Sequence, residues 1–219
     1  MNKLYVETVS AQLQEYLELL MKMESLSLFR LVGGTALSLQ LGHRMSIDID
    51  LFTDAEYGLI DTIAIKHELE NTFEIVKNAE DLEKRAPGYS LFCGNNVNNI
   101  IKLDLYYTDS FIFPIKKMGT IRLAALEEIA AMKMLAICNG SRKKDFWDIH
   151  ELLKHFSLTE MIQWGIQRHP YNLQFEVLVE KLQHISNFAD NTKIICLRNK
   201  YWEFIKEDIE EKAQEISLY

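Results

Sequence analysis

The chain has 219 residues, of which 48% are hydrophobic and 26% charged, values typical of a globular protein large enough to bury a core. Its 24 basic and 32 acidic residues give a net charge of −8, which argues against broad, nonspecific binding of nucleic acid. No apolar run reaches the roughly 20 residues of a membrane span, and the N-terminal stretch is too polar for a signal peptide. We therefore predict a cytoplasmic protein without membrane contact, whose three separated cysteines are free thiols.

The first half of the chain mixes helical and strand patterns. In chain order these patterns predict a helix over 7–23, strand over 28–32, short helix over 35–41, strand over 47–52, helix over 59–72, and strands over 73–78, 89–93 and 99–107. Gly33-Gly34 forms the tight turn before the short helix, with Thr35 near the N-cap. Turn residues between the last two strands predict a hairpin.

The second half is almost entirely helical in pattern. After Gly119 the periodicity and helix propensity predict helices over 124–138, 144–156, 158–167, 171–186 and 191–216. We therefore predict an α+β protein with two domains. Residues 1–120 would form a mixed sheet flanked by helices, and residues 121–219 an all-helical domain that closes a cleft over it.

The strand over 47–52 carries acids on one face. Strict alternation places Asp48 and Asp50 on the same side, about 7 Å apart along the strand, and the apolar residues on the other: Ile47, Ile49 and Leu51. Asp104 lies on the polar face of the strand over 99–107. If these strands are neighbours, three carboxylates converge, and a pair 4 Å apart repels by about 4 kcal/mol at an effective dielectric constant of 20. Such a cluster suits Mg²⁺ or Mn²⁺, with room for two ions and substrate phosphates.

The Gly33-Gly34-Thr35 turn complements this acidic strand. Glycines let the backbone approach a ligand closely, and the free N–H groups at the start of the following helix attract phosphate. Arg44 and Ser46 precede the acidic strand and could contact phosphate or brace the carboxylates. A nucleoside triphosphate with its metal ions would satisfy both the turn and the acids.

Polar residues in two later helices are further candidates. Lys133 lies in an otherwise apolar helix, so it either reaches the surface along its alkyl chain or points into a polar cleft. Asp145 and Asp148 are three residues apart on one helical face. Asp145 could equally be an acid placed at a helix N-terminus by the helix dipole. The basic run Arg142-Lys143-Lys144 suits either a solvated surface or a local basic groove.

Together these motifs resemble a known family. G-G-T-A-L followed by R-x-S-x-D-x-D-L-F is similar to the nucleotidyltransferase domain of the AbiEii/AbiGii toxin family, within the DNA polymerase beta-like nucleotidyltransferase superfamily. The lysine helix AAMKMLAI and the following SRKKDFWDIHELL continue the resemblance, which covers roughly residues 28–155.

The resemblance implies a metal-dependent transfer of a nucleoside monophosphate from an NTP to an acceptor, with release of pyrophosphate. Asp48, Asp50 and Asp104 would hold the metal, and Asp104 could also be the general base. Lys133 would reach a phosphate from the helical domain, and Asp145 would be a motif residue of that domain. Nucleotide contacts would come from these residues: Gly33, Gly34, Thr35, Arg44, Ser46 and Lys133. The resemblance also implies a toxin linked to phage defence, an antitoxin partner, and a tRNA end or a protein as acceptor.

We compare three alternative functions with the predicted nucleotidyl transfer. A haloacid dehalogenase-type phosphatase needs Asp-x-Asp-x-Thr, whereas DIDLFT places the threonine one residue late. A glycosyltransferase that uses Asp-x-Asp needs a longer alternating βα region than residues 1–120 provide. A catalytically silent nucleotidyltransferase-like scaffold that acts through a protein partner stays open, although the presence of all three carboxylates argues against it.

Overall fold

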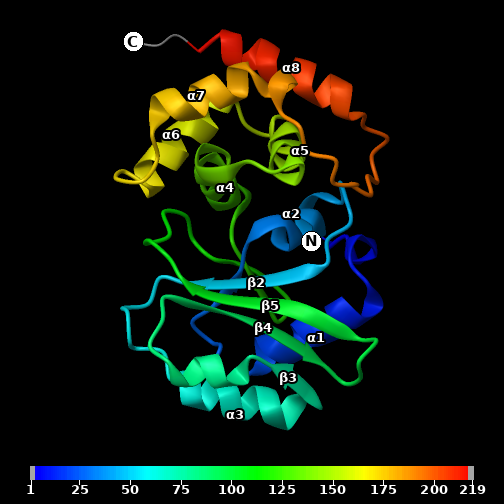
Figure 1. The fold of residues 1–219 in the computed structure, drawn as a ribbon, viewed down its shortest axis with the longest axis vertical. Helices are drawn as coiled ribbons and strands as arrows, with labels where there is room; N and C mark the ends of the chain where they lie inside the picture. Colours follow the sequence, from blue (N-terminus) through cyan, green and yellow to red (C-terminus); the bar gives the residue numbers. More distant parts are fainter. Residues whose placement is uncertain (1–2, 217–219) are drawn as a thin grey trace.

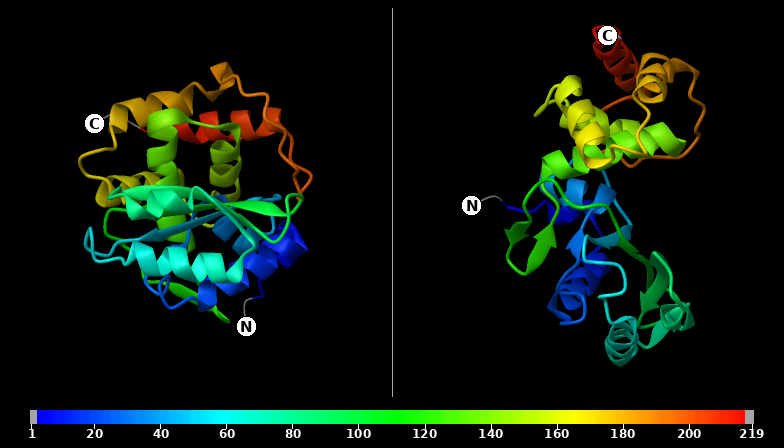
Figure 2. Two further views of the ribbon diagram at one scale, coloured as in Figure 1. Left: turned by 60° about the horizontal axis from the view of Figure 1, so that its bottom comes forward. Right: turned by 90° about the vertical axis from the view of Figure 1, so that its left-hand side faces the viewer.

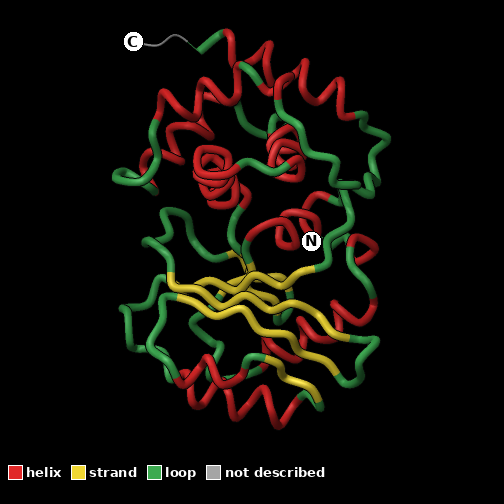
Figure 3. Tube along the Cα trace, in the orientation of Figure 1, coloured by secondary structure: helices red, strands yellow, loops and turns green. Residues whose placement is uncertain are grey.

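A seven-stranded mixed sheet organises the N-terminal half of this computed structural model, which describes residues 3–216 (Figures 1 and 3). The strand order is β3-β4-β5-β2-β1-β7-β6. The strands span Arg30–Leu31 (β1), Asp48–Thr53 (β2), Ile75–Lys77 (β3), Gly88–Gly94 (β4), Ile100–Tyr107 (β5), Lys116–Met118 (β6) and Ile121–Leu123 (β7). β2 runs parallel to β5 and antiparallel to β1, whereas β4 and β5 form the predicted antiparallel hairpin.

Helices accompany the sheet and then form a second lobe. With the sheet lie η1 (Val6–Thr8), α1 (Ala11–Lys22), α2 (Gly33–Leu41), α3 (Thr62–Thr72) and η2 (Ala79–Glu83). The second lobe contains α4 (Leu126–Gly140), α5 (Lys143–Leu152), α6 (Leu158–Arg168), α7 (Phe175–Gln183), η3 (Ile185–Asn187) and α8 (Trp202–Gln214). Figure 2 separates the two lobes, and Figure 1 shows α2 between the sheet and the helices α4 and α5, both of which it contacts. The α+β fold that we predicted is confirmed.

Local sequence explains where several helices begin. Ser10 caps α1 by accepting a hydrogen bond from Leu13 N at 3.0 Å, so the predicted helix over 7–23 is divided into η1 and α1. Asp61 caps α3 in the same way, at 2.9 Å from Ala64 N. Ser157 and Glu160 form a reciprocal capping box at the start of α6.

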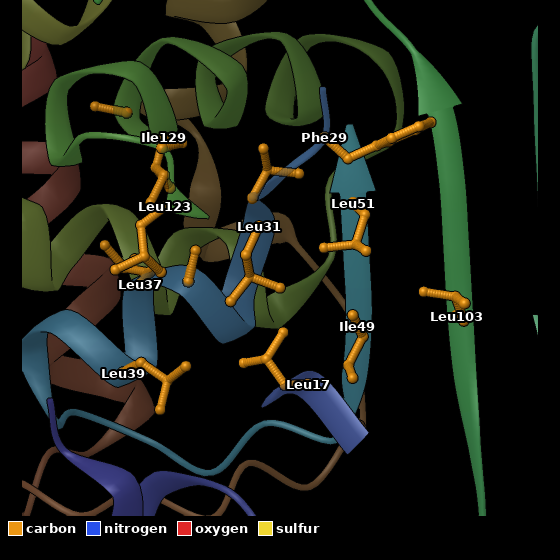
Figure 4. Close-up of a cluster of buried hydrophobic side chains, with 14 of the residues drawn as sticks. Leu17, Phe29, Leu31, Leu37, Leu39, Ile49, Leu51, Leu103, Leu123 and Ile129 are labelled. Carbon is orange, nitrogen blue, oxygen red and sulfur yellow. The ribbon is translucent and has the colours of Figure 1, made fainter. Parts of the chain in front are cut away.

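One buried core joins the sheet to the helical lobe (Figure 4). Leu31, Ile49 and Leu103 line its sheet side, Leu37 comes from α2, and Ile129 comes from α4; each is fully buried. Each such side chain contributes about 1.5–3 kcal/mol on burial. Because α2 and α4 share this core, the helical lobe is held firmly over the strands that carry the acids.

Two predicted regions differ in the structure. β6 and β7 were not predicted, because three-residue strands are too short to show alternation. Their hairpin contains residue 120, and β7 pairs with β1 (Leu31↔Leu123), so the sheet ends at Leu123 and the helices begin at Leu126. Ile47 is 74% exposed instead of facing the core, because β2 begins only at Asp48.

The predicted helix over 191–216 is wrong for its first part. Only α8 is helical, while residues 195–197 run beside the loop that follows α2. Met45 N donates to Ile195 O and Leu197 N donates to His43 O, both at 2.9 Å. These long-range backbone hydrogen bonds replace helical ones, and we call residues 190–200 the strap.

The cysteines and the helix lengths agree with the composition. All three cysteines are free, Cys93 and Cys138 being buried, and burial raises the pKa of the Cys93 thiol to about 12. Among the described residues, every helix is too short or too polar to cross a membrane.

Candidate active site

The three predicted carboxylates meet at the centre of the sheet. β2 and β5 are adjacent and parallel, and their register places Asp50 directly opposite Asp104. Asp48 lies two residues before Asp50 and therefore on the same face. The side chain of Asp48 is 33% exposed and that of Asp104 14%, so the cluster lies at the edge of solvent.

The negative charge of this cluster is only partly compensated. Ser90 Oγ donates to Asp104 Oδ1 at 2.7 Å, and Lys102 Nζ lies 2.5 Å from Asp104 Oδ2. Lys144 Nζ, from α5, is 3.9 Å from Asp48 Oδ2. Within residues 3–216, Asp50 has no such hydrogen bond or ion pair. Its burial together with the carboxylates of Asp104 and Asp48 raises its pKa to about 6.

The donor set fits a hard divalent cation, with one rearrangement. Three carboxylates around an underneutralised Asp50 are the oxygen ligands that Mg²⁺ and Mn²⁺ prefer. Within residues 3–216, however, no three acidic, histidine or cysteine side chains are already placed to hold one ion. The ammonium group of Lys102 contacts one oxygen of Asp104. A cation that bound this oxygen would compete with Lys102 for it.

The two glycines at the start of α2 make room for specific side chains. Gly33 has φ +67°, and a Cβ there would lie 2.7 Å from Asp50 Oδ2. A Cβ on Gly34 would lie 2.3 Å from Arg44 Nη2. The first N–H groups of a helix have no intrahelical partner, so these glycines bring unpaired backbone donors next to Asp50. Such donors suit an anion, here beside the acidic cluster.

Gly33→Ala should damage this site more than the fold. The φ of +67° and the contact with Asp50 both oppose a side chain, so we expect a loss of about 1–2 kcal/mol in unfolding free energy. The displaced Asp50 should lower nucleotide affinity by at least tenfold. Urea unfolding and NTP titration measure the two effects, and Gly140→Ala, which has open space for a Cβ, is the control.

Thr35 and Ser46 differ from the prediction. Thr35 is the third residue of α2, whose N-cap is Val32, and its side chain is completely buried. Its hydroxyl bonds to the backbone oxygen of Asp48 and lies 2.8 Å from Ser46 Oγ. The Thr35 hydroxyl is thereby engaged within the protein beside the start of β2, and Ser46 accepts a hydrogen bond from it.

Arg44 also contacts a different partner from the predicted one. Its Nε and Nη2 donate to the two carboxylate oxygens of Asp148 at 2.7 and 2.8 Å. His43 Nε2 is 2.8 Å from Asp148 Oδ1, and Lys133 Nζ is 2.6 Å from Asp148 Oδ2. Burial opposes ionisation of Asp148, but Lys133, Arg44 and the hydrogen bond from His43 outweigh it and hold its pKa well below the usual value.

Lys133 is buried in a polar cluster and does not reach the surface. Besides Asp148 it contacts Asp145 Oδ1 at 2.8 Å, and Arg142 Nε lies 3.1 Å from the other oxygen of Asp145. Asp145 also accepts a hydrogen bond from Arg142 N at 3.1 Å at the start of α5, which is the predicted role of an acid at a helix N-terminus. Asp145 and Asp148 thus engage two of the three donors of the buried Lys133 ammonium group.

Comparison with known proteins identifies the family. Residues 17–169, more than half of the chain, match the family described as Nucleotidyl transferase AbiEii toxin, Type IV TA system. The chain belongs to this AbiEii family. Membership in a toxin–antitoxin family implies a cognate antitoxin.

Individual relatives support the same fold for this AbiEii-family chain. It is 26% identical over 209 residues to the uncharacterized protein aq_aa25 of Aquifex aeolicus, covering 92% of this chain and 96% of that one. MenT4, a nucleotidyltransferase toxin of Mycobacterium tuberculosis, superposes with a TM-score of 0.56 at 14% identity, covering 95% of this chain and 87% of MenT4. JHP933 of Helicobacter pylori gives 0.53 at 19% identity, covering 93% and 88%.

Sequence reasoning gave no role to several residues around the candidate site of this AbiEii-family chain. Ser90, which contacts Asp104, carried no signal in the sequence, whereas the alternation of the strand over 99–107 already places Lys102 on the face of Asp104. His43 carried no signal, since its partner Asp148 is 105 residues away. Lys144 belonged to a basic run that suits a solvated surface equally well; in the structure it faces Asp48, and burial, with Arg142 nearby, lowers its pKa.

Proposed function

We propose that this protein transfers a nucleoside monophosphate from an NTP to an acceptor hydroxyl. The observation that carries the proposal is the register of β2 and β5, which places three carboxylates against the N-terminus of α2. The acceptor oxygen would attack the α-phosphorus while the bond to the β-phosphate oxygen breaks, so that pyrophosphate leaves. Asp104 would take the proton of the acceptor hydroxyl.

Asp48, Asp50 and Asp104 are the residues that would hold Mg²⁺ or Mn²⁺, in a site with room for two ions. Bound metal would supply charge neutralisation and a more nucleophilic acceptor oxygen. The free N–H groups at Gly33 and Gly34 would bind the triphosphate. Buried Lys133 and Arg44 would support the site through Asp148, adding positive potential below it.

Lys144 would be the mobile cation of the site. It is one-third exposed and close to Asp48, so it can turn toward a triphosphate that reaches the acids. Lys144→Met should raise the KM for the NTP about tenfold, equivalent to about 1.4 kcal/mol, with a smaller change in kcat. Initial rates against NTP concentration measure this. Lys143→Met is the matched control, because Lys143 Nζ lies 5.4 Å from the Trp202 ring instead of facing the acids.

The acceptor would be an RNA end, such as that of a tRNA, or a protein. Arg142 is 60% exposed beside Lys144, which suits a short polyanionic end despite the acidic total charge. As the toxin of a toxin–antitoxin pair, the protein would act in the cytoplasm and arrest infected cells in phage defence. Expression of the wild type, but not of Asp48→Ala, should then stop growth.

The test of the function is a labelling experiment. The purified protein is incubated with each α-³²P-labelled NTP, Mg²⁺ or Mn²⁺, and either total bacterial RNA or the protein alone. A labelled band that disappears in Asp48→Ala would establish the transfer and identify base and acceptor. Absence of both label and NTP binding would instead favour the silent scaffold.

A further inference from the structure

A large cavity lies at the opposite end of α2 from the acidic cluster. It has a volume of 830 Å³, within the range of ligand pockets, and its lining includes Gln40 and Leu41 at the end of α2. None of the residues predicted for catalysis or nucleotide binding lines it. α2 has nine residues, so the cavity is about 13 Å from the start of that helix.

The cavity is formed by both lobes. Lys3 and Tyr5 of the N-terminal segment and Lys116 of β6 come from the sheet lobe, whereas His155 after α5 and Arg198 of the strap come from the helical lobe. A ligand held between them would contact the same two lobes that enclose the acidic cluster.

Several cations of the lining have no carboxylate partner. Lys3, Lys116 and Arg198 take part in none of the ion pairs formed within residues 3–216. Of the two lining acids, Glu151 is neutralised by lysines at 3.0 and 2.6 Å, and Glu7 is exposed. In a chain with a net charge of −8, three unpaired cations around one hollow favour an anionic occupant.

The same cavity offers apolar and aromatic surface. Leu4, Met118 and Leu126 line it, and the ring of Tyr5 is 37% exposed. The guanidinium of Arg198 lies 5.4 Å from the centre of the Tyr5 ring and donates to Leu41 O at 2.8 Å. An arginine beside a tyrosine ring is suited to a planar group that carries negative charge.

We infer that this cavity is a second ligand site, separate from the acidic cluster, for a phosphate-bearing ligand with a planar group, of the nucleotide class. The unpaired cations bind the phosphates, and Tyr5 with its apolar neighbours covers the base. α2 and α5 both begin at the acidic cluster and end at the cavity. A ligand in the cavity would therefore affect how the two lobes are arranged around the acidic cluster.

Calorimetric titration in EDTA tests this site without relying on transfer activity. ATP and inorganic triphosphate are the probes, because the metal-free acidic cluster repels both. We expect one ATP site in the wild type, unchanged in Asp48→Ala. Lys3→Gln/Lys116→Gln should weaken it at least tenfold. Neither lysine side chain forms a hydrogen bond or ion pair within residues 3–216, so the change should leave the fold intact.

The matched control is Lys22→Gln/Lys212→Gln, which makes the same change in charge at exposed positions outside the cavity. It should bind ATP within twofold of the wild type. The inference is overturned if ATP does not bind in EDTA, if both double variants lose binding equally, or if Asp48→Ala abolishes it. Triphosphate binding as tight as that of ATP would overturn the nucleotide class.

Discussion

Asp50→Asn should abolish nucleotidyl transfer, by at least a thousandfold, while making the protein more stable at pH 8. The carboxylate is at the centre of the three acids, so its loss removes the charge that would hold a cation. Asparagine keeps the shape of the side chain and removes the repulsion from Asp104 and Asp48. Label incorporation and urea unfolding on the same preparations measure both effects.

The pH dependence of this stabilisation has a definite sign. The pKa of Asp50 is raised from 3.8 to about 6 in the folded protein, so the folded state favours the protonated acid. The wild type should lose stability as the pH rises from about 4 through about 6. At pH 8 the free energy of unfolding of Asp50→Asn should therefore exceed that of the wild type by about 1–2 kcal/mol, a value reduced for the partial solvent access of Asp50. Near pH 4 the two free energies should be equal. An Asn variant that is less stable at pH 8 would contradict this electrostatic account.

Asp148→Asn should cause the largest loss of stability among single substitutions at the site. Asp148 is completely buried and carries the negative charge that balances Arg44 and Lys133. Removing one member of a buried ion cluster costs about 3–5 kcal/mol, and Asp145, which still contacts Lys133, keeps the expected loss near the lower value. Chemical denaturation at pH 7 measures it.

The control for this prediction is Asp208→Asn. Asp208 pairs with His150 at 2.8 Å but is 53% exposed, so its loss should cost less than about 1 kcal/mol. The pKa of Asp148 is lowered in the fold, so its contribution is present above the unfolded pKa and lost as the pH falls through the folded value. The stability that the wild type has over Asp148→Asn should therefore be lost in acid, whereas in acid the wild type regains the stability that ionised Asp50 costs it at pH 8. Equal losses of unfolding free energy in Asp148→Asn and Asp208→Asn would contradict the view that Asp148 stabilises a buried ion cluster.

The carboxylates were predictable because their signal is local. The alternation of acidic and apolar residues in DIDLF predicts a strand with one face toward solvent. A second alternating strand carries Asp104. That β2 and β5 are adjacent was a condition of the prediction, and the register Asp50↔Asp104 fulfils it. The α+β division followed from the same change of periodicity along the chain.

The partners of the other polar residues could not be predicted, because they depend on contacts between distant segments. Arg44 and Asp148 are 104 residues apart, and nothing near Arg44 in the sequence indicates that it prefers a buried aspartate to a phosphate. The strap fails as a helix for a similar reason, since its backbone pairs with the loop at residues 43–45. β6 and β7 were too short to leave a periodic signal.

The strap has a consequence for the order in which the site is assembled during synthesis. Residues 195–197 supply the backbone partners of the loop that presents His43 and Arg44 to Asp148. A ribosome must therefore translate past the strap, and release it from the exit tunnel, before that loop is held in place. The acids of β2 and β5 are made much earlier, so the acidic cluster is synthesised well before the loop beside it can be fixed.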